Sequence, residues 1–205
     1  TLFQMLAGAV EVLDAAGCAL ARGHSVEGGE LALALAINGL IDVDLGRIRR
    51  KEGMRAGECL LLTKPLGTGT LLAAKGRLRA TGRWIDAVLL AMQQANQEAA
   101  GCLRAHGVSA CSNVTGCGLL GHLLAMTRAS GVLVELDLDA LPVLDGAVET
   151  LAQGLVGSSH AANQRLRTAL RNPEEGADHP HYPLLFDPQT GGGLLASVPA
   201  MPPLS

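Results

Sequence analysis

The stretch VSACSNVTGCGLLGHLLAMTR, residues 108–128, decides how the fold of this chain is interpreted. It begins with a short apolar run that is typical of a buried strand. Small polar residues and the glycines Gly116 and Gly118 follow, and leucines then recur at the spacing of one helix face. The stretch therefore predicts a strand, a glycine-rich turn and a helix.

The predicted turn has two interpretations. The first turn of a helix carries unpaired N–H groups and the positive end of the helix dipole, and glycines allow a phosphate to approach that backbone. The same residues also suit an ordinary capped helix, because Asn and Thr are common N-caps and glycine turns are widespread. The pattern alone leaves phosphate binding and simple capping open.

The composition indicates a compact globular protein. Of the 205 residues, 48% are hydrophobic and 17% are charged, which argues against disorder and allows one good core or two small ones. Aromatic residues make up only 2%, so we expect a core of Leu, Val, Ile and Ala. The net charge of −3 gives no general attraction to nucleic acid or to anionic membranes, and neither is an expected partner.

The sequence shows no membrane-spanning run, no signal peptide and no pattern of paired cysteines. The longest uncharged apolar run, residues 31–41, is too short to span a bilayer, and nothing resembling a signal peptide opens the chain. We therefore expect a cytoplasmic protein. The five cysteines form no CxxC pair and fit neither a disulfide framework nor a zinc site, so most are expected to be small buried hydrophobic residues.

We expect the first 56 residues to form part of one domain. Apolar residues recur at helical spacing in residues 2–16, and the run at residues 31–43 favours a buried strand, although its leucines and alanines would also suit a helix. Because Thr1 lies almost inside the predicted helix, the chain is expected to begin within a domain.

Residues 57–205 are expected to form a second domain. The pattern predicts strands at 59–63, 108–111 and 132–138, a long helix over 84–105, and a last strand that follows the glycines 191–193. Alternating strands and helices indicate a layered α/β or α+β domain. Lys64 stands where the first of these strands ends, beside Thr68 and its flanking glycines, so it could contact a phosphate or could be a solvated turn lysine.

Three longer motifs resemble one known family. TKPLGTGTLLAA (63–74), SNVTGCGLLGHLLAM (112–126) and FDPQTGGGLLASVP (186–199) occur in the order and spacing of selenophosphate synthetase, also called selenide, water dikinase. ARGHSVEGGELALALAINGLI (21–41) is a weaker fourth match, to the family's Gly-Gly-His segment and the strand after it. The resemblance covers nearly the whole chain and corresponds to the family's later two-thirds.

The resemblance implies the fold shared with aminoimidazole ribonucleotide synthetase and thiamine-monophosphate kinase. Residues 1–56 would be the remnant of an N-terminal dimerisation domain, and residues 57–205 a C-terminal α+β domain. The expected partners are a second copy of the chain, ATP and selenide, with Mg²⁺ held by carboxylates, and the products are selenophosphate, phosphate and AMP. Gly23, His24 and Ser25 would be the nucleotide-side residues of this chain.

The sequence also departs from the family's pattern. The family has a metal-binding aspartate at the position of Asn113, which keeps one carbonyl oxygen but loses the charge. Arg22 replaces the first glycine of Gly-Gly-His. The family's catalytic cysteine or selenocysteine, its partner lysine and its other metal aspartates belong to the N-terminal third, so no catalytic residue is expected in these 205 residues.

Two functions follow from these residues. The chain is either part of a working selenophosphate synthetase, or a degenerate homologue that keeps nucleotide binding or dimerisation without dikinase activity. Asn113 is the main observation that favours the second.

Overall fold

The computed structural model describes residues 1–40 and 50–200. The chain divides into two compact units, Thr1–Arg47 and Ile48–Ser205. This boundary lies before the predicted one between residues 56 and 57, because residues 50–56 already belong to the second unit. Met54 is part of its core and only 6% exposed, and the N–H groups of Gly53 and Met54 both donate to Ser130 Oγ.

The first unit contains the predicted helix α1 (Leu2–Ala15). The predicted apolar stripe is only partly buried: Val10 and Leu13 are half-buried, whereas Leu2 and Leu6 are exposed. No residue of the helix is fully buried. The helix is followed by Gly17 in the left-handed conformation, with φ of 64°.

The predicted buried strand at residues 31–43 is wrong over the part that the structure describes. Residues 31–40 have no regular secondary structure and are exposed except for the half-buried Leu33, and residues 41–43 lie outside the described part. A strand needs a neighbouring strand to accept its backbone hydrogen bonds, and the described residues of the first unit contain none. The apolar run therefore has nothing to pair with in this unit.

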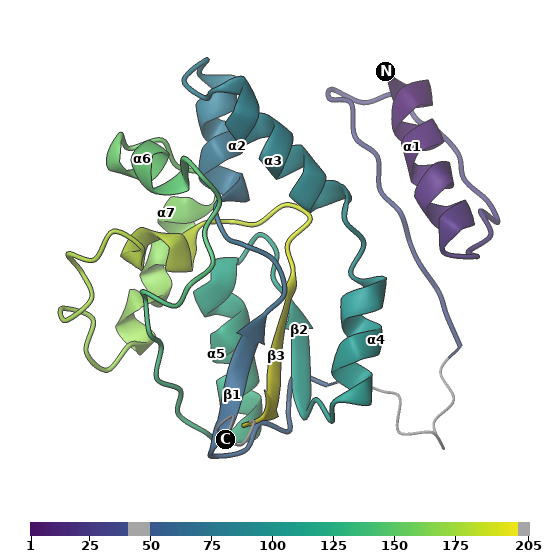
Figure 1. Ribbon diagram of the computed structural model, residues 1–205. Coiled ribbons are helices and arrows are strands. Elements are labelled where there is room, and N and C mark those ends of the chain that lie inside the picture. The colour runs from purple at the N-terminus through teal and green to yellow at the C-terminus, as the bar shows by residue number, and fades with distance from the viewer. Residues whose placement is uncertain (41–49, 201–205) are drawn as a thin grey trace. The chain divides into compact units, whose positions relative to one another are not determined.

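The second unit is built on a three-stranded sheet of β1 (Glu58–Leu62), β2 (Ala110–Asn113) and β3 (Leu194–Pro199). The order is β1-β3-β2, and β3 is antiparallel to both neighbours. β1 and β2 therefore run in the same direction, and both end where β3 begins (Figure 1). The unit is α+β, as predicted.

Helices cover both faces of this sheet because alternate residues of β3 point to opposite sides. Leu195 packs in the main core with residues of α5 (Gly118–Ser130), whereas Ala196 packs with Leu103 of α4 (Gln97–Ala105). Figure 1 shows α5 and α4 beside the strands.

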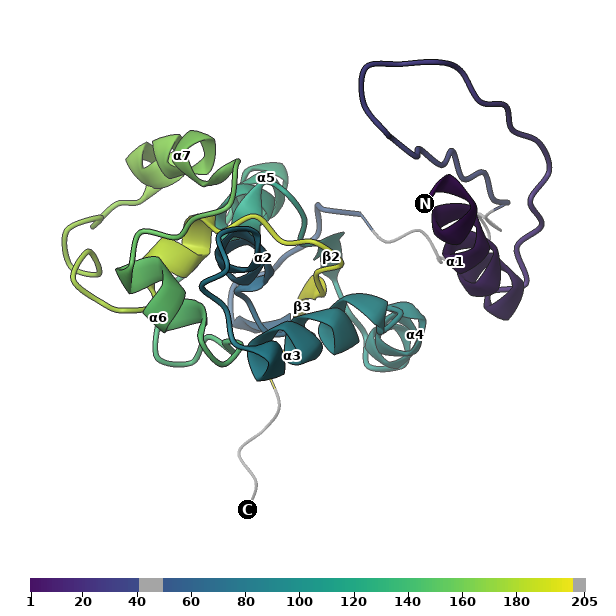
Figure 2. The same cartoon turned by 90° about the horizontal axis from the view of Figure 1, so that it is seen from above.

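Further helices surround the end of the sheet where β1 stops. α2 (Thr68–Gly76) contacts both α3 (Gly82–Gln93) and α6 (Ala147–Ala152), as seen from above in Figure 2. The short α7 (His160–Asn163) continues into a 3-10 helix, Gln164–Ala169, and a second 3-10 helix covers Tyr182–Phe186. In the part of the chain that is described, no helix has the length and apolar character needed to cross a membrane.

The single long helix predicted over residues 84–105 is instead two helices, α3 and α4. The break falls at residues 94–96. Lys64 Nζ donates to the carbonyl oxygens of Ala91 and Gln94 at the end of α3, and the Asn96 side chain donates to Gly192 O. These tertiary contacts stabilise the end of α3, which the apolar stripe could not indicate.

The segment at residues 132–138 keeps its predicted alternation but forms no strand. Val132, Val134, Leu136 and Leu138 pack against the core while the residues between them are exposed. Within the described residues, the main chain of 133–137 makes no hydrogen bond with another strand. A cavity of about 650 Å³ lies along β1 and is lined mainly by residues 54–57, by β1 and by residues 132–137 and 140–142.

The outer edge of β1 faces this cavity. Thr63 N–H donates to Leu194 O, and in an antiparallel pair the residues that bond to the neighbour alternate with residues that do not. The main-chain groups of Leu60 and Leu62 therefore point away from β3. Both residues line the cavity.

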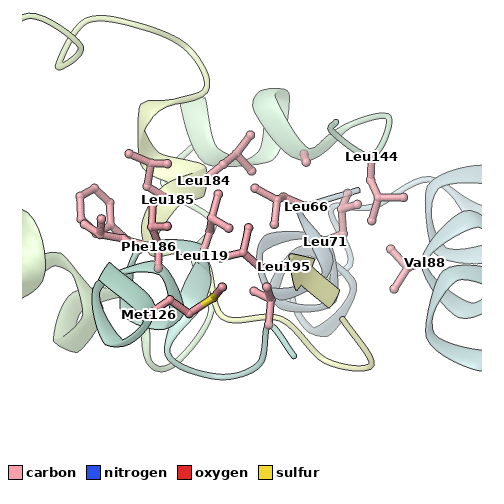
Figure 3. Packing of buried hydrophobic residues seen from close by; sticks show 14 of the residues in the cluster. Leu66, Leu71, Val88, Leu119, Met126, Leu144, Leu184, Leu185, Phe186 and Leu195 are labelled. Carbon is pink, nitrogen blue, oxygen red and sulfur yellow. The ribbon is translucent and has the colours of Figure 1, made fainter. Parts of the chain in front are cut away.

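The core of the second unit is aliphatic, as the composition predicts. Figure 3 shows its leucines meeting between the sheet, α5 and α2, with Phe186 and Met126 at one side. The prediction of mostly buried cysteines is wrong: Cys59, Cys102 and Cys117 are exposed, and the other two are half-buried.

One residue between α2 and α3 allows a stability test. Leu78 has φ of 56° and is 93% exposed, so it bears the strain of the left-handed conformation without packing. We expect Leu78→Gly to raise the free energy of unfolding by about 0.5 kcal/mol, because relief of about 1–2 kcal/mol of strain exceeds the unfolded-state entropy of glycine. Urea denaturation measures the change. Leu78→Ala is the control and should give no gain, and a less stable Leu78→Gly protein would contradict the prediction.

Candidate functional site

The three glycine-containing motifs of the sequence meet at one end of the sheet. β1 leads into residues 63–70, β2 leads into residues 113–118, and residues 187–193 lead into β3. Because β1 and β2 end where β3 begins, the topology brings these segments together. Val114 N–H donates to Gly193 O, and Thr63 Oγ1 accepts from Leu194 N–H, so the three segments are directly bonded.

The N-terminus of α2 is occupied by side chains of the 187–193 segment. Asp187 Oδ2 accepts from Gly69 N–H at 3.1 Å, and Gln189 Oε1 accepts from the N–H groups of Gly67 and Thr68 at 3.2 and 3.4 Å. A side chain at Gly69 would collide with the main-chain oxygen of Pro188. The protein's own groups therefore occupy the positions where a phosphate would meet this helix.

Asp187 is a carboxyl group with an altered titration. It is fully buried, and burial raises the pKa of Asp187 to about 7. The hydrogen bonds from Gln189 and from the backbone of Gly69 and Thr70 lower the pKa and offset part of this effect. Gln189 Nε2 also donates to Asp187 Oδ2 at 2.9 Å, so the two side chains act as one unit.

Lys64, the predicted phosphate contact, is committed to the protein backbone. Its Nζ donates to Ala91 O at 2.9 Å, Gln94 O at 2.6 Å and Gly191 O at 2.8 Å, which accounts for all three ammonium protons. The side chain is buried, and burial lowers the pKa of Lys64. A phosphate contact would require these bonds to break, so the geometry favours a structural role.

The turn at residues 113–118 is held in place from several sides. His122 Nε2 accepts from Thr115 N–H at 3.1 Å, Gln189 N–H donates to Thr115 O at 3.0 Å, and Asn163 Nδ2 donates to Gly116 O at 2.8 Å. Gly118 has φ of 70°, and a Cβ there would lie 3.0 Å from Leu185 O. A residue with a side chain at Gly118 would therefore be strained.

Unlike the N-terminus of α2, this turn is accessible. Asn113, Gly116 and Cys117 are exposed. Among the described residues, the N–H groups of Gly116 and Cys117 have no hydrogen-bond partner. The turn before α5 is thus the one glycine turn of the three segments that combines exposed backbone donors, a helix N-terminus and the polar side chain of Asn113.

The remaining predicted site residues belong to the other unit. Gly23, His24 and Ser25 are exposed and lie in a stretch without regular secondary structure. In residues 1–40 and 50–200, no group of three or more His, Cys, Asp or Glu side chains could hold a metal ion. Asn113 offers a single neutral oxygen, so these residues do not form a complete Mg²⁺ site by themselves.

Residues 55–177 match the family model described as AIR synthase related protein, C-terminal domain, which is more than half of the chain. The chain belongs to the AIR synthase related family. The AIR synthase related domain contains β1, β2 and the turn before α5, and the segment at residues 187–193 follows the matched range.

Curated relatives of this AIR synthase related chain include dikinases. It is 41% identical over 198 residues to the selenide, water dikinase of Geobacter metallireducens, and 39% identical over 199 residues to that of Trichlorobacter lovleyi. The alignments cover 96% of this chain but 57% and 56% of the relatives. The chain therefore spans a little more than half the length of the curated relatives it matches.

The chain is also similar to solved structures. One of them is the thiamine-monophosphate kinase from Stenotrophomonas maltophilia K279a, with a TM-score of 0.49 and 20% sequence identity, over 76% of this chain and 44% of that chain.

Sequence reasoning missed the residues that fix the two turns. Asp187 and Gln189 belong to the motif at residues 186–199, but nothing in the sequence indicates that their side chains reach α2, more than a hundred residues earlier. His122 and Asn163 were also missed. The only signal was their polar character within otherwise apolar or small-residue stretches.

A substitution of Lys64 tests its structural role. We expect Lys64→Met to lower the free energy of unfolding by about 3 kcal/mol, because it leaves three carbonyl groups without their charged donor. Lys75→Met is the control, since Lys75 is an exposed lysine of α2 and should change stability by less than about 0.5 kcal/mol. Denaturant unfolding gives both values. Unchanged stability of Lys64→Met would refute the structural role.

Asp187 predicts a pH dependence of stability. Its pKa of about 7 in the folded protein exceeds the ordinary value of 3.8, so unfolding releases a proton between these values. The free energy of unfolding should therefore fall as pH rises from about 4 to 7, by up to about 4 kcal/mol from this group. Asp187→Asn cannot ionise and should remove that part of the slope. Urea denaturation of both proteins from pH 4 to 8 measures it, and parallel curves would contradict the assignment.

Proposed function

We propose that this chain is part of a selenide, water dikinase, which makes selenophosphate, phosphate and AMP from ATP, selenide and water. The names of the curated relatives and the three motifs in family order support this assignment. The observation that carries it is the difference between the two helix N-termini. In the turn before α5, Gly116 and Cys117 are exposed and their N–H groups have no partner among the described residues, whereas the N-terminus of α2 is already occupied.

In this proposal the turn before α5 faces the phosphates of ATP. Exposed N–H groups of Gly116 and Cys117, together with the helix dipole of α5, favour a negatively charged group. Asn113 lies beside them and would offer its amide oxygen to a Mg²⁺ ion that the phosphates hold. When bound, Mg²⁺ supplies charge neutralisation for phosphoryl transfer. Carboxylates from outside these described residues would have to complete its ligands.

Other parts of the proposal rest on the family resemblance alone. Gly23, His24 and Ser25 would contact the nucleotide from the first unit. The complete enzyme would be a cytoplasmic homodimer. Lys64 is assigned to the backbone of the second unit and not to ATP, because its three donors are used there.

A second candidate function is a degenerate homologue that keeps the fold without dikinase activity. The uncharged Asn113 favours it, because a neutral amide oxygen holds Mg²⁺ more weakly than a carboxylate.

Calorimetric titration of ATP into the full-length protein, with and without Mg²⁺, separates the two functions. We expect Mg²⁺-dependent binding, and we expect Asn113→Asp to strengthen it by about tenfold because the carboxylate adds a charged ligand. Gln153→Glu is the control, since it adds the same charge at an exposed position of the second unit and should leave ATP affinity unchanged.

Each outcome has a defined meaning. Mg²⁺-dependent binding followed by selenide-dependent release of AMP would support the dikinase. Mg²⁺-dependent binding without AMP release would favour the degenerate homologue. No binding by the full-length protein would overturn nucleotide binding, and an unchanged affinity of Asn113→Asp would remove Asn113 from the metal site.

A further inference from the structure

The side chain of His122 spans the beginning and the middle of the turn before α5. Its ring lies under the turn and is 9% exposed. Nδ1 lies 3.1 Å from Ser112 Oγ on β2, and Nε2 lies 3.1 Å from the backbone N of Thr115 and 3.0 Å from Thr115 Oγ1. The two residues that it contacts stand on either side of Asn113 and Val114.

The bond from Thr115 defines the tautomer of the ring. A backbone N–H can only donate, so Nε2 must accept and carries no proton. A neutral imidazole then has its proton on Nδ1, which donates to Ser112 Oγ, and the Ser112 hydroxyl is free to donate to Asn113 O at 3.3 Å. Burial and the positive charge of Lys51 lower the pKa of His122, which keeps this neutral form.

We propose that His122, as the neutral Nδ1–H tautomer, is the positioning residue that holds the turn at residues 113–118 in its ligand-binding form. Its side chain is buried, and it acts through Ser112 and Thr115. By fixing these two residues it sets where Asn113 and the free N–H groups of the turn lie. The ligand in this inference, the phosphates of ATP, rests on the proposed function, but the positioning of the turn does not.

Few side chains can do this. The side chain at position 122 must donate a hydrogen bond to Ser112 Oγ from an atom close to the α5 backbone. It must also accept a hydrogen bond from Thr115 N–H at an atom further along the side chain, and both atoms must be buried. Leucine fills a similar volume but leaves Thr115 N–H and the Ser112 hydroxyl without their partner. Glutamine carries one donor and one acceptor on a common amide and can restore part of the bridge.

The first experiment concerns the turn alone. Nitrogen-15 NMR of the histidine rings should give a protonated Nδ1 and an unprotonated Nε2 for His122. Amide exchange of Thr115 should become at least about tenfold faster in His122→Leu and should return most of the way in His122→Gln. A protonated Nε2, or an unchanged exchange rate in His122→Leu, would overturn the inference.

The second experiment measures ATP affinity in the full-length protein by calorimetry with Mg²⁺. We expect about tenfold weaker binding for His122→Leu and recovery in His122→Gln. His160→Leu is the matched control, because His160 is also a buried histidine of the second unit, but its ring packs against Phe186 and its Nδ1 has no hydrogen-bond partner among the described residues. It should keep wild-type affinity even where its free energy of unfolding changes.

The two experiments separate the inference from the proposed function. If the tautomer and the exchange rates are as expected but no protein binds ATP, the positioning role stands and the proposed function fails. If wild type binds ATP and His122→Leu binds it equally well, the positioning role fails and the proposed function stands.

Discussion

The second unit depends on one buried pair, Asp187 and Gln189. Their side chains bond the start of α2, more than a hundred residues earlier in the chain, and Gln189 N–H bonds the turn before α5. The pair thereby connects all three glycine-containing segments at the end of the sheet. It also determines which helix N-terminus remains open. A buried carboxyl occupies one of them, whereas the other is held by neutral groups, Thr115 and His122, and stays exposed.

Much of this fold could be predicted from local pattern. Helix α1, the strand β1 and the turn into α5 lie where apolar spacing and glycines place them, whereas β2 begins and ends two residues later than predicted, at Ala110 and Asn113. The predictions failed where a distant partner decides the outcome. Lys64 stabilises the end of α3 and divides a helix whose apolar stripe is continuous, and residues 31–40 lack the neighbouring strand that their composition favours.

The sequence predicted where the turn before α5 lies in the chain, but not which side chains hold this turn in place. The motif at residues 112–126 indicated a turn with a helix N-terminus, and the structure has that turn with exposed N–H groups. For Lys64, the sequence could not show whether the ammonium group contacts a phosphate or backbone carbonyl groups, because both accept hydrogen bonds from it. Burial decides between them, and burial is a property of the assembled fold. Gly23, His24 and Ser25 are still a prediction.

The outer edge of β1 also bears on how readily the protein aggregates. Leu60 and Leu62 direct their N–H and C=O groups away from β3, and these groups have no main-chain partner within residues 1–40 and 50–200. Such an edge is a ready template for a strand of another molecule. Across the cavity, the exposed Glu135 and Asp137 put two negative charges on the facing segment. Charges beside an open edge repel a second copy that carries the same charges. Glu135 and Asp137 should therefore disfavour edge-to-edge pairing of two copies, and high salt should weaken this effect.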